Sequence, residues 1–356
     1  AKIIFGNYIM KKLIRSIILL LIILTISCDS PTEIIEDTKP GRRDYVWSVD
    51  TLDAPGTAYY RMWGSSPSNL WMISSSNWDK SIAHYDGEKW SLYGEPGIVD
   101  PYSIYGFSSS NIYIGTMGHV WNYDGANWNH ITELPKDNNN HAVINNIWGD
   151  SPNSIYAYGA YPEENGYYNN SVIVHYSSGK WEMYNTDMLY GIVSRLYKNK
   201  FDNHIYLQVI GGRNLTDSTS IYEYKNGGYN LLYSDLWIKG KQSDLSYIDG
   251  EVYFIMGSRI AVRRNDKFYT LLNVDNPNFY QRIWGRNSKD IFLLMTDGLA
   301  HYNGSDMEYL FYFNRPDDRP YTQIYGAALF ENISIFLVRE PSTGLNMIYT
   351  GRINVN

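Results

Sequence analysis

The sequence is poor in cysteine, in basic residues and in helical patterns. Cys28 is the only cysteine among 356 residues, which excludes an intrachain disulfide. Few long stretches have apolar residues at helical spacing, so a mainly helical fold is not expected. Acidic residues outnumber basic ones by 37 to 30, for a net charge of −7, and no Lys/Arg-rich patch follows residue 45. The chain therefore lacks the positive patch that neutralises phosphates, and no nucleic-acid partner is expected.

Signatures of common catalytic and metal sites are also missing from the sequence. There is no HExxH, no G-x-S-x-G, no Walker loop and no EF-hand run. The seven histidines are dispersed without the spacing of metal ligands. We therefore predict no catalytic residue, no metal and no cofactor.

What the sequence does contain is hydrophobic and aromatic. Hydrophobic residues make up 44% of the chain and charged residues 19%, a balance that excludes general disorder. The 34 tyrosines and 11 tryptophans suit half-buried sheet surfaces. The length allows one large β domain or about two average domains.

The N-terminal residues are interpreted as a targeting segment rather than part of a fold. The basic stretch KKLIR at 11–15 precedes a wholly apolar run at 17–24. That run is too short to span the hydrocarbon core of a bilayer, which needs roughly 20 residues. We assign 1–27 as a signal peptide, in which 1–9 are an upstream extension before the true start.

Cys28 is predicted to be the lipidated N-terminus of the mature protein. The small residue Ser27 before it resembles the lipobox of bacterial lipoproteins, although Thr25 stands where a Leu is more usual. A diacylglyceryl group with an N-acyl chain anchors more firmly than the single acyl chain that binds membranes only marginally. The polar segment 28–43 then reads as a tether. The alternative is a stray thiol in an uncleaved membrane anchor.

Internal repeats are the strongest signal, and periods near 40 residues indicate propellers or solenoids. YRMWGSSPSNLWMI at 60–73, YSIYGFSSSNIYIG at 102–115 and NNIWGDSPNSIYAY at 145–158 share one pattern. It returns at 281–294 and, with more differences, in the rest of the chain. Aromatic anchors recur at intervals of 37 to 50 residues. The seven anchors are Trp63, Tyr105, Trp148, Tyr197, Tyr247, Trp284 and Tyr325.

Each repeat predicts four short strands separated by turn residues, which matches one propeller blade. The last repeat stops after its third strand, near Ile353, while an unmatched strand at 44–52 precedes the first repeat. Pairing of these two segments would close the ring and leave no open edge. We therefore predict an all-β, seven-bladed propeller over 44–356, with four antiparallel strands per blade.

The repeats resemble a bacterial family of secreted propellers whose blades read W-G-x-S-x-x-N-I-Y and then H-Y-D-G-x-x-W. The resemblance covers about 45–353 and extends distantly to the BNR/Asp-box propellers. Asp86-Gly87 and Asp124-Gly125 are adjacent, whereas an Asp-box has one residue between Asp and Gly. The resemblance implies blade architecture and is weak for function, since propellers have many unrelated activities.

HYDGEKW at 84–90 has two interpretations. His84 and Asp86 could be an acid/base pair or metal ligands. Alternatively, Asp-Gly forms a tight hairpin turn in which both central residues have positive φ, and Tyr85 and Trp90 make a cross-strand contact. Near-copies occur in several blades, and an enzyme rarely has one active site per blade. The structural interpretation is therefore preferred.

A sialidase-like active site is the sharpest enzymatic hypothesis. It would combine an Arg cluster for a substrate carboxylate with a Tyr nucleophile and its Glu partner. The Arg-Ile-Pro stretch of that family is missing, because Arg61 and Arg195 are followed by Met and Leu. Arg259, Arg282 and Arg286 are scattered over two blades, and their convergence is not expected.

Long loops on one face of the ring are the predicted ligand site. Loops between second and third strands share a face with the connectors between blades, and exposed aromatics there suit glycan or peptide recognition. The alternative is that these loops are tolerated insertions. The residues chosen for ligand binding are Trp78, Tyr161, Tyr167, Tyr168, Trp237 and Asp317.

Together these features predict a monomeric lipoprotein propeller that is displayed on a bacterial cell envelope. The lipid bilayer would be its partner through the Cys28 acyl anchor, on the outer membrane or the cell surface. The propeller would bind an envelope protein or an extracellular polysaccharide as a binding or assembly module. The alternative function is a sialidase-like, glycoside-active enzyme.

Overall fold

A computed structural model describes residues 39–134, 141–164, 166–211, 218–313 and 322–353. The chain divides into two units, 1–38 and 39–356, of which only the second falls in the described ranges. The predicted signal peptide and Cys28 therefore lie outside the described residues. No helix in the described ranges is long and apolar enough to cross a membrane.

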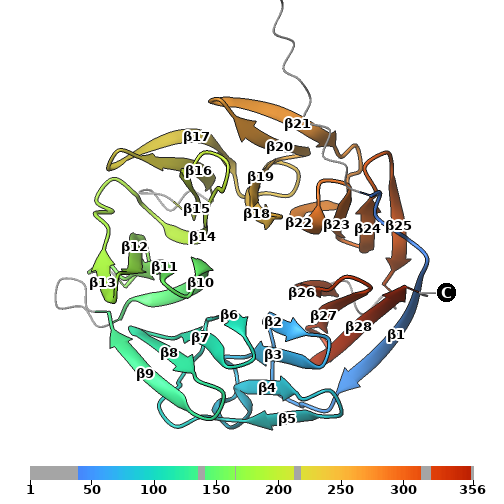
Figure 1. Ribbon diagram of the computed structural model, residues 1–356, viewed down its shortest axis with the longest axis horizontal. Coiled ribbons are helices and arrows are strands. Elements are labelled where there is room, and N and C mark those ends of the chain that lie inside the picture. Colours follow the sequence, from blue (N-terminus) through green and yellow to red (C-terminus); the bar gives the residue numbers. More distant parts are fainter. Residues whose placement is uncertain (1–38, 135–140, 165, 212–217, 314–321, 354–356) are drawn as a thin grey trace, which may run out of the picture. The chain divides into compact units, whose positions relative to one another are not determined.

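Seven four-stranded antiparallel sheets form a ring, so the prediction of a seven-bladed propeller is confirmed (Figure 1). The strands of blades 1 to 4 are, in order, β2 (Arg61–Ser66), β3 (Asn69–Ile73), β4 (Ile82–Tyr85) and β5 (Trp90–Tyr93); β6 (Ser103–Ser108), β7 (Asn111–Gly115), β8 (His119–Tyr123) and β9 (Trp128–Glu133); β10 (Val143–Ser151), β11 (Ser154–Tyr161), β12 (Asn170–Ser177) and β13 (Lys180–Met183); β14 (Ile192–Lys198), β15 (Ile205–Ile210), β16 (Ser218–Lys225) and β17 (Gly228–Leu236).

The remaining blades follow the same order around the ring. Their strands are β18 (Ser243–Ile248), β19 (Glu251–Met256), β20 (Arg259–Arg264) and β21 (Lys267–Asn273) in blade 5; β22 (Phe279–Asn287), β23 (Asp290–Met295), β24 (Gly298–Tyr302) and β25 (Met307–Tyr312) in blade 6; and β26 (Gln323–Leu329), β27 (Ile333–Glu340), β28 (Leu345–Ile353) and β1 (Tyr45–Leu52) in blade 7. One short 3-10 helix, η1 (Trp78–Lys80), lies between β3 and β4.

The N-terminal strand completes the last blade, as predicted. β1 pairs antiparallel with β28 in an unbroken register from Tyr45↔Ile353 to Leu52↔Asn346. Figure 1 shows β1 on the outer rim beside β28. The pairing supplies the fourth strand of blade 7 and closes the ring with strands from both ends of the domain.

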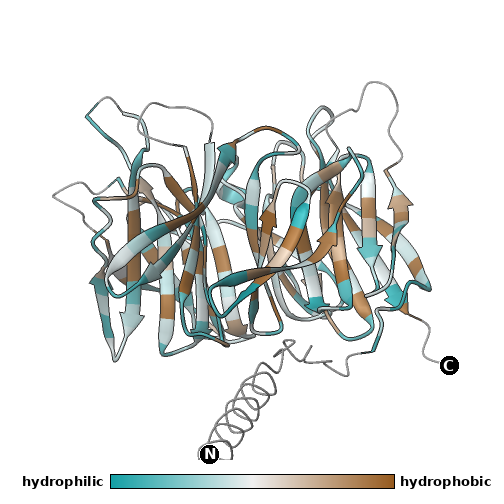
Figure 2. Cartoon of the chain, turned by 90° about the horizontal axis from the view of Figure 1, so that it is seen from above, coloured by the Kyte–Doolittle hydropathy of each residue, from teal (hydrophilic) through white to brown (hydrophobic). Residues whose placement is uncertain are grey.

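Neighbouring blades pack through the aromatic anchors and the glycine that follows many of them. The ring of Trp63 on β2 packs against Gly106 on β6, where an added Cβ would lie 2.7 Å from the indole. In the W-G dipeptide of the repeat, the aromatic ring therefore fills the interface with the next blade. The glycine leaves room for the aromatic ring of the preceding blade. Apolar residues line the strands between blades, and hydrophilic residues are common toward the loops (Figure 2).

The two faces of the ring differ in their loops. The hairpins between first and second strands and between third and fourth strands lie on one face, here called the turn face. The loops between second and third strands and the connectors between blades lie on the opposite face, here called the connector face. This arrangement follows from four antiparallel strands per blade.

HYDGEKW is the hairpin between β4 and β5, but its predicted turn type is wrong. Gly87 has φ of +101°, whereas Asp86 is not in the positive-φ region. The Asp86 carboxylate accepts the backbone N–H groups of Glu88 and Lys89, each at 2.9 Å, and so closes a four-residue loop. Type I′ turns, with both central residues at positive φ, occur elsewhere, as at Asn226-Gly227.

Candidate functional site

The residues predicted from sequence to bind ligand are spread over several blades. Trp78 is 67% exposed on η1 of blade 1, and Tyr167 is 55% exposed in the β11–β12 loop. Tyr161 packs partly against a core cluster and lines a separate cavity beside Asn170. Trp237 alone among them lines a cavity at the central channel.

The other two predicted ligand-binding residues, Tyr168 and Asp317, are not among the described residues that line the cavity at the central channel. Tyr168 is half-buried in the β11–β12 loop. Asp317 lies outside the described residues. The predicted residues thus do not share one cavity within the described part of the chain.

The histidines of the HYDG-like motifs belong to a repeated structural contact. His84 stacks on Trp71 at 3.9 Å between ring centroids, and its Nε2 lies 2.7 Å from Asn69 Oδ1. The same contact, between the residue at or just before the start of the second strand and a residue of the third strand, recurs in other blades. The equivalent hydrogen-bonded pairs in blades 2, 3, 4 and 6 are Asn111–Asn122, Ser154–His175, His204–Glu223 and Asp290–His301.

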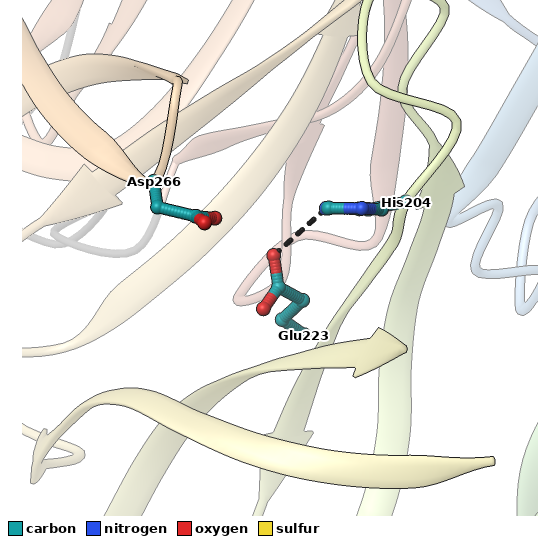
Figure 3. Close-up of side chains that lie close together, drawn as sticks. All are labelled: His204, Glu223 and Asp266. Carbon is teal, nitrogen blue, oxygen red and sulfur yellow. Dashed lines mark hydrogen bonds and ion pairs between the residues drawn. The ribbon is translucent and has the colours of Figure 1, made fainter. Parts of the chain in front are cut away.

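His204, Glu223 and Asp266 are the only group in the described residues whose donor atoms are close enough together for a metal ion (Figure 3). Nδ1 of His204 lies 2.9 Å from Glu223 Oε1, and Asp266 approaches from the β20–β21 turn. The Arg263 guanidinium lies 3.5 Å from Glu223 and 3.0 Å from Asp266. The two carboxylates are thus paired with the guanidinium of Arg263, a cationic side chain. We interpret the group as the form that the repeated contact takes in blade 4.

A second polar cluster lies in the central channel, on the innermost strands. Arg61, Arg195 and Arg282 each stand two residues before the aromatic anchor of their repeat, on β2, β14 and β22. Equivalent positions of different blades converge in a propeller because every first strand faces the axis (Figure 1). Arg259, Arg282 and Arg286 do not converge with one another, as expected: Arg259 lies on β20 beside Thr270, and Arg286 pairs with Asp290. Arg282 instead joins Arg195 and Arg61, a grouping that was not predicted from the sequence.

Asp244 at the start of β18 is the carboxylate of this channel cluster. Its Oδ1 lies 3.3 Å from Arg195 Nε, and its Oδ2 lies 3.1 Å from Arg282 Nε. Asp244 is buried, and Oδ1 also accepts the backbone N–H of Leu245 at 2.9 Å. One carboxylate thus bridges two guanidinium groups that come from neighbouring blades on either side.

Arg61 has no carboxylate partner among the described residues. Its Nη1 donates to the carbonyl of Tyr60 at 3.1 Å, and its guanidinium lies over the Tyr60 ring. Its Nε is buried without a hydrogen-bond partner. A buried donor without a partner costs free energy unless a ligand or water satisfies it.

The pKa values in the channel reflect this excess of positive charge. Burial lowers the pKa of Arg61 to about 10, and repulsion from Arg195 and Arg282 contributes. Burial and Arg195 also lower the pKa of Arg282. Burial opposes the charge of Arg195, but Asp244, Tyr197 and Tyr158 together more than offset it and raise the Arg195 pKa. The cluster thus combines three arginine side chains with a single carboxylate side chain.

A cavity of about 120 Å³ opens beside this cluster at the connector face. Asp244 and Arg282 line it together with Trp237 and the buried side chains of Gln208 and Ser243. Gln208 Oε1 and Ser243 Oγ are buried without hydrogen-bond partners. The cavity therefore combines positive charge with unsatisfied polar atoms, which is typical of a site for a small polar group.

Gln281 separates this cavity from a second one of about 470 Å³. Its φ of +44° is unusual for a residue with a side chain, and such strain is often found at functional sites. Gln281 Oε1 accepts the backbone N–H of Gly240 at 3.1 Å, and its Nε2 donates to the Phe279 carbonyl at 2.9 Å. The residue thus lines both cavities and holds the β17–β18 connector.

The arrangement can bind an anion, because two guanidinium groups share one carboxylate and a third, that of Arg61, has none among the described residues. The sequence contained a signal for this site. Six of the seven repeats carry a polar residue two places before the anchor: Arg61, Ser103, Asn146, Arg195, Arg282 and Gln323. When the repeats are aligned on their aromatic anchors, Arg61, Arg195 and Arg282 fall in the same column, and this alignment predicts that they lie close together in the ring.

Comparisons with known proteins establish the fold alone. No protein-family model and no curated protein matches the sequence. Among solved structures, virginiamycin B lyase from Staphylococcus aureus is 11% identical, with a TM-score of 0.63 over 87% of this chain and 100% of the other. YCF48 bound to D1 peptide is 14% identical, with a TM-score of 0.58 over 89% and 100%. The extracellular domain of BT4673 from B. thetaiotaomicron is 13% identical, with a TM-score of 0.55 over 85% and 39%.

Proposed function

We propose that this protein is a lipid-anchored envelope propeller that binds the anionic group of an envelope protein or extracellular glycan in its central channel. The observation that carries the proposal is the imbalance of charge around Asp244. Arg195 and Arg282 share that single carboxylate, and Arg61 has none within the described residues. A carboxylate ligand would supply the missing negative charge.

The channel site is preferred over the exposed loops because it has the features of a preorganised site. The arginines stand on the innermost strands rather than on loops, so the closed ring fixes their separation. Positive charge inside a partly buried channel also attracts anions more strongly than charge on an open surface. Trp237 is the one loop residue predicted from sequence that lines the same cavity.

Export and anchoring rest on the sequence of residues 1–43 and remain proposals. The basic and apolar segments followed by Ser27-Cys28 support a lipoprotein signal. The solved structures of similar fold include one extracellular domain and one propeller with bound peptide, which supports an exported binding module. Palmitate labelling of the wild-type chain, and its loss in Cys28→Ala, tests the anchor.

Glycoside hydrolysis remains the alternative because an arginine cluster also suits the carboxylate of an acidic sugar. Hydrolysis would further need a nucleophile and an acid. Burial raises the pKa values of Tyr158 and Tyr197 beside the cluster, which keeps both phenols protonated and poorly nucleophilic. The geometry therefore favours binding, and release of 4-methylumbelliferone from acidic glycosides would favour the enzyme.

Arg61→Met tests the proposed site. We expect the purified full-length variant to bind acetate and glucuronate about tenfold or more weakly, since one charge-assisted hydrogen bond is lost. Its free energy of unfolding should be equal or higher, because repulsion among the arginines is relieved. Arg352→Met, on the exposed surface of β28, is the matched control. Isothermal titration that shows equal binding by wild type and Arg61→Met would overturn the proposal.

A further inference from the structure

We infer that the channel ligand is a polypeptide whose carboxylate follows an apolar segment, rather than a glycan. This inference rests on the proposed function and names the partner class of the same site. The carboxylate would enter the cavity beside Arg282, and the apolar segment would lie across the exposed residues 236–238, at the end of β17 and the start of the β17–β18 connector. The size of the cavity, the connector and the second cavity each support it.

The cavity beside Arg282 is too small for a sugar ring with its hydroxyl groups. Its volume of about 120 Å³ is below the ~150 Å³ of a protein cavity that holds one benzene molecule. A carboxylate with one or two further atoms fits this space. The cavity therefore recognises the end of a ligand and leaves the rest of it outside, above the connector face.

Three consecutive apolar side chains are exposed at the edge of that cavity. Leu236, Trp237 and Ile238 are 48%, 44% and 50% exposed, and Trp237 also lines the cavity. A tryptophan alone would suit stacking on a sugar, but aliphatic Leu and Ile favour apolar side chains of a partner. This ledge, residues 236–238, therefore fits a polypeptide better than a hydroxylated glycan.

Two lysines extend the positive charge from the channel to the ledge. Lys239 and Lys241 are exposed, and neither forms an ion pair within the described residues. They would attract an acidic segment toward the cavity by long-range electrostatics. Charge complementarity therefore selects a partner that is both apolar and acidic near its carboxylate.

The ledge is held in place before any partner binds. The backbone N–H groups of Lys241 and Gln242 both donate to the Ile238 carbonyl at 3.0 Å, and Tyr233 Oη donates to the Lys241 carbonyl at 3.0 Å. Gln281 accepts the Gly240 N–H from below. A connector fixed in this way loses little conformational entropy on binding.

The second cavity offers hydrogen-bonding groups that suit a peptide backbone. Its volume is about 470 Å³, and Ser258, Asn273, Asp275 and Asn276 line it together with the buried Phe279. Amide side chains can both donate to and accept from peptide groups. Gln281 lines both cavities. A peptide whose carboxylate is bound in the first cavity would therefore pass over Gln281 to reach the second.

Fluorescence anisotropy with labelled peptides tests the inference. The probe is an eight-residue peptide with an apolar segment, two acidic residues and a free C-terminus, used with the full-length protein. We expect it to bind about tenfold or more tightly than glucuronate. Ile238→Asp should weaken peptide binding about tenfold or more and leave acetate binding unchanged. Trp78→Ala, an exposed tryptophan of blade 1 on the same face, is the control and should change neither.

Two further arms separate the outcomes. Loss of binding on amidation of the peptide assigns the terminal carboxylate, whereas retention by an amidated peptide with an internal Asp assigns a side-chain carboxylate. Polyuronate that binds more tightly than every peptide would overturn the inference in favour of a glycan. Equal loss of acetate and peptide in Ile238→Asp would also overturn it. If Arg61→Met leaves carboxylate binding intact, the proposed function itself fails, which is a separate result.

Discussion

Two buried charged clusters of this propeller differ in one respect, namely whether their charges balance. On the turn face, the carboxylates of Glu223 and Asp266 are matched by two cations, Arg263 and Lys225. The His204 ring also contacts Glu223. In the channel, Asp244 pairs with Arg195 and Arg282, and Arg61 of a third blade has no carboxylate partner among the described residues. The balanced cluster is one example of a contact that other blades repeat, whereas the channel cluster occurs once.

In a repeat protein, this difference in charge balance distinguishes a polar cluster that stabilises the fold from one that could bind a ligand. A polar contact that recurs at the same register in blade after blade stabilises the blade itself. A polar cluster formed by only some repeats has no such explanation, and its unbalanced charge needs a partner from outside. Four substitutions test whether this distinction holds.

The largest effect is expected from the carboxylate of the channel. Asp244→Asn leaves three guanidinium groups without a carboxylate, and breaking such a buried pair costs about 3–5 kcal/mol of unfolding free energy. Added acetate should raise the melting temperature of this variant more than that of wild type, because an anion can replace the carboxylate. Urea denaturation with and without acetate measures both effects. A loss below about 1 kcal/mol would show that the channel charges are not coupled.

A smaller effect is expected from Asp290 on the turn face, where the charges balance. Asp290 accepts from His301 Nε2 at 2.7 Å and from Arg286 at 2.6 Å. Asp290→Asn should cost about 1.5–3 kcal/mol at neutral pH. Acetate should give no rescue, because Arg286 also donates to Tyr45, Ser334 and the Phe330 carbonyl.

The same carboxylate gives a pH dependence of known sign. Burial opposes ionisation of Asp290, but His301 and Arg286 more than offset it and lower its pKa below 3.8. The stabilisation is therefore complete above pH 3.8 and is lost as the pH falls through the lowered pKa. Acid denaturation of Asp290→Asn should show a shallower limb below pH 3.8 than wild type. Identical acid limbs would contradict the assignment.

The smallest effect is expected at the histidine of the repeated motif. His84→Phe keeps an aromatic ring on Trp71 and loses the bond to Asn69, whose Oδ1 still accepts from Trp71 Nε1 at 3.0 Å. We expect a loss of about 0.5–1.5 kcal/mol and unchanged ligand binding. His175→Phe in blade 3 should behave alike. Loss of binding in either variant would return these histidines to the list of site candidates.

The architecture was predictable because it depends on features that repeat. The aromatic anchors, the glycine after them and the closing strand at 44–52 follow from spacing alone, and the β1–β28 pairing confirmed the closure. The turn type of HYDGEKW was not predictable from the Asp-Gly pair. There the Asp86 side chain accepts two backbone N–H groups, so a four-residue loop replaces the expected two-residue turn.

The channel site was missed because its residues are distant in sequence and close only after ring closure. Arg61, Arg195 and Arg282 are far apart along the chain, yet they occupy one column of the repeat alignment. Trp237 was chosen for its exposure and does line the site, but the ledge it forms with Leu236 and Ile238 depends on how the connector folds. No local pattern encodes that conformation.

Closure of blade 7 by β1 and β28 also sets the order of events in folding. β1 is synthesised first and β28 last, so the final pairing waits until the whole domain is made. Such non-local pairing is slow compared with hairpin formation inside the other blades. In the interval the outer edge of β28 is open to any free strand, including β1 of a second copy. The rate of this one step therefore determines how long the new chain is exposed to strand exchange.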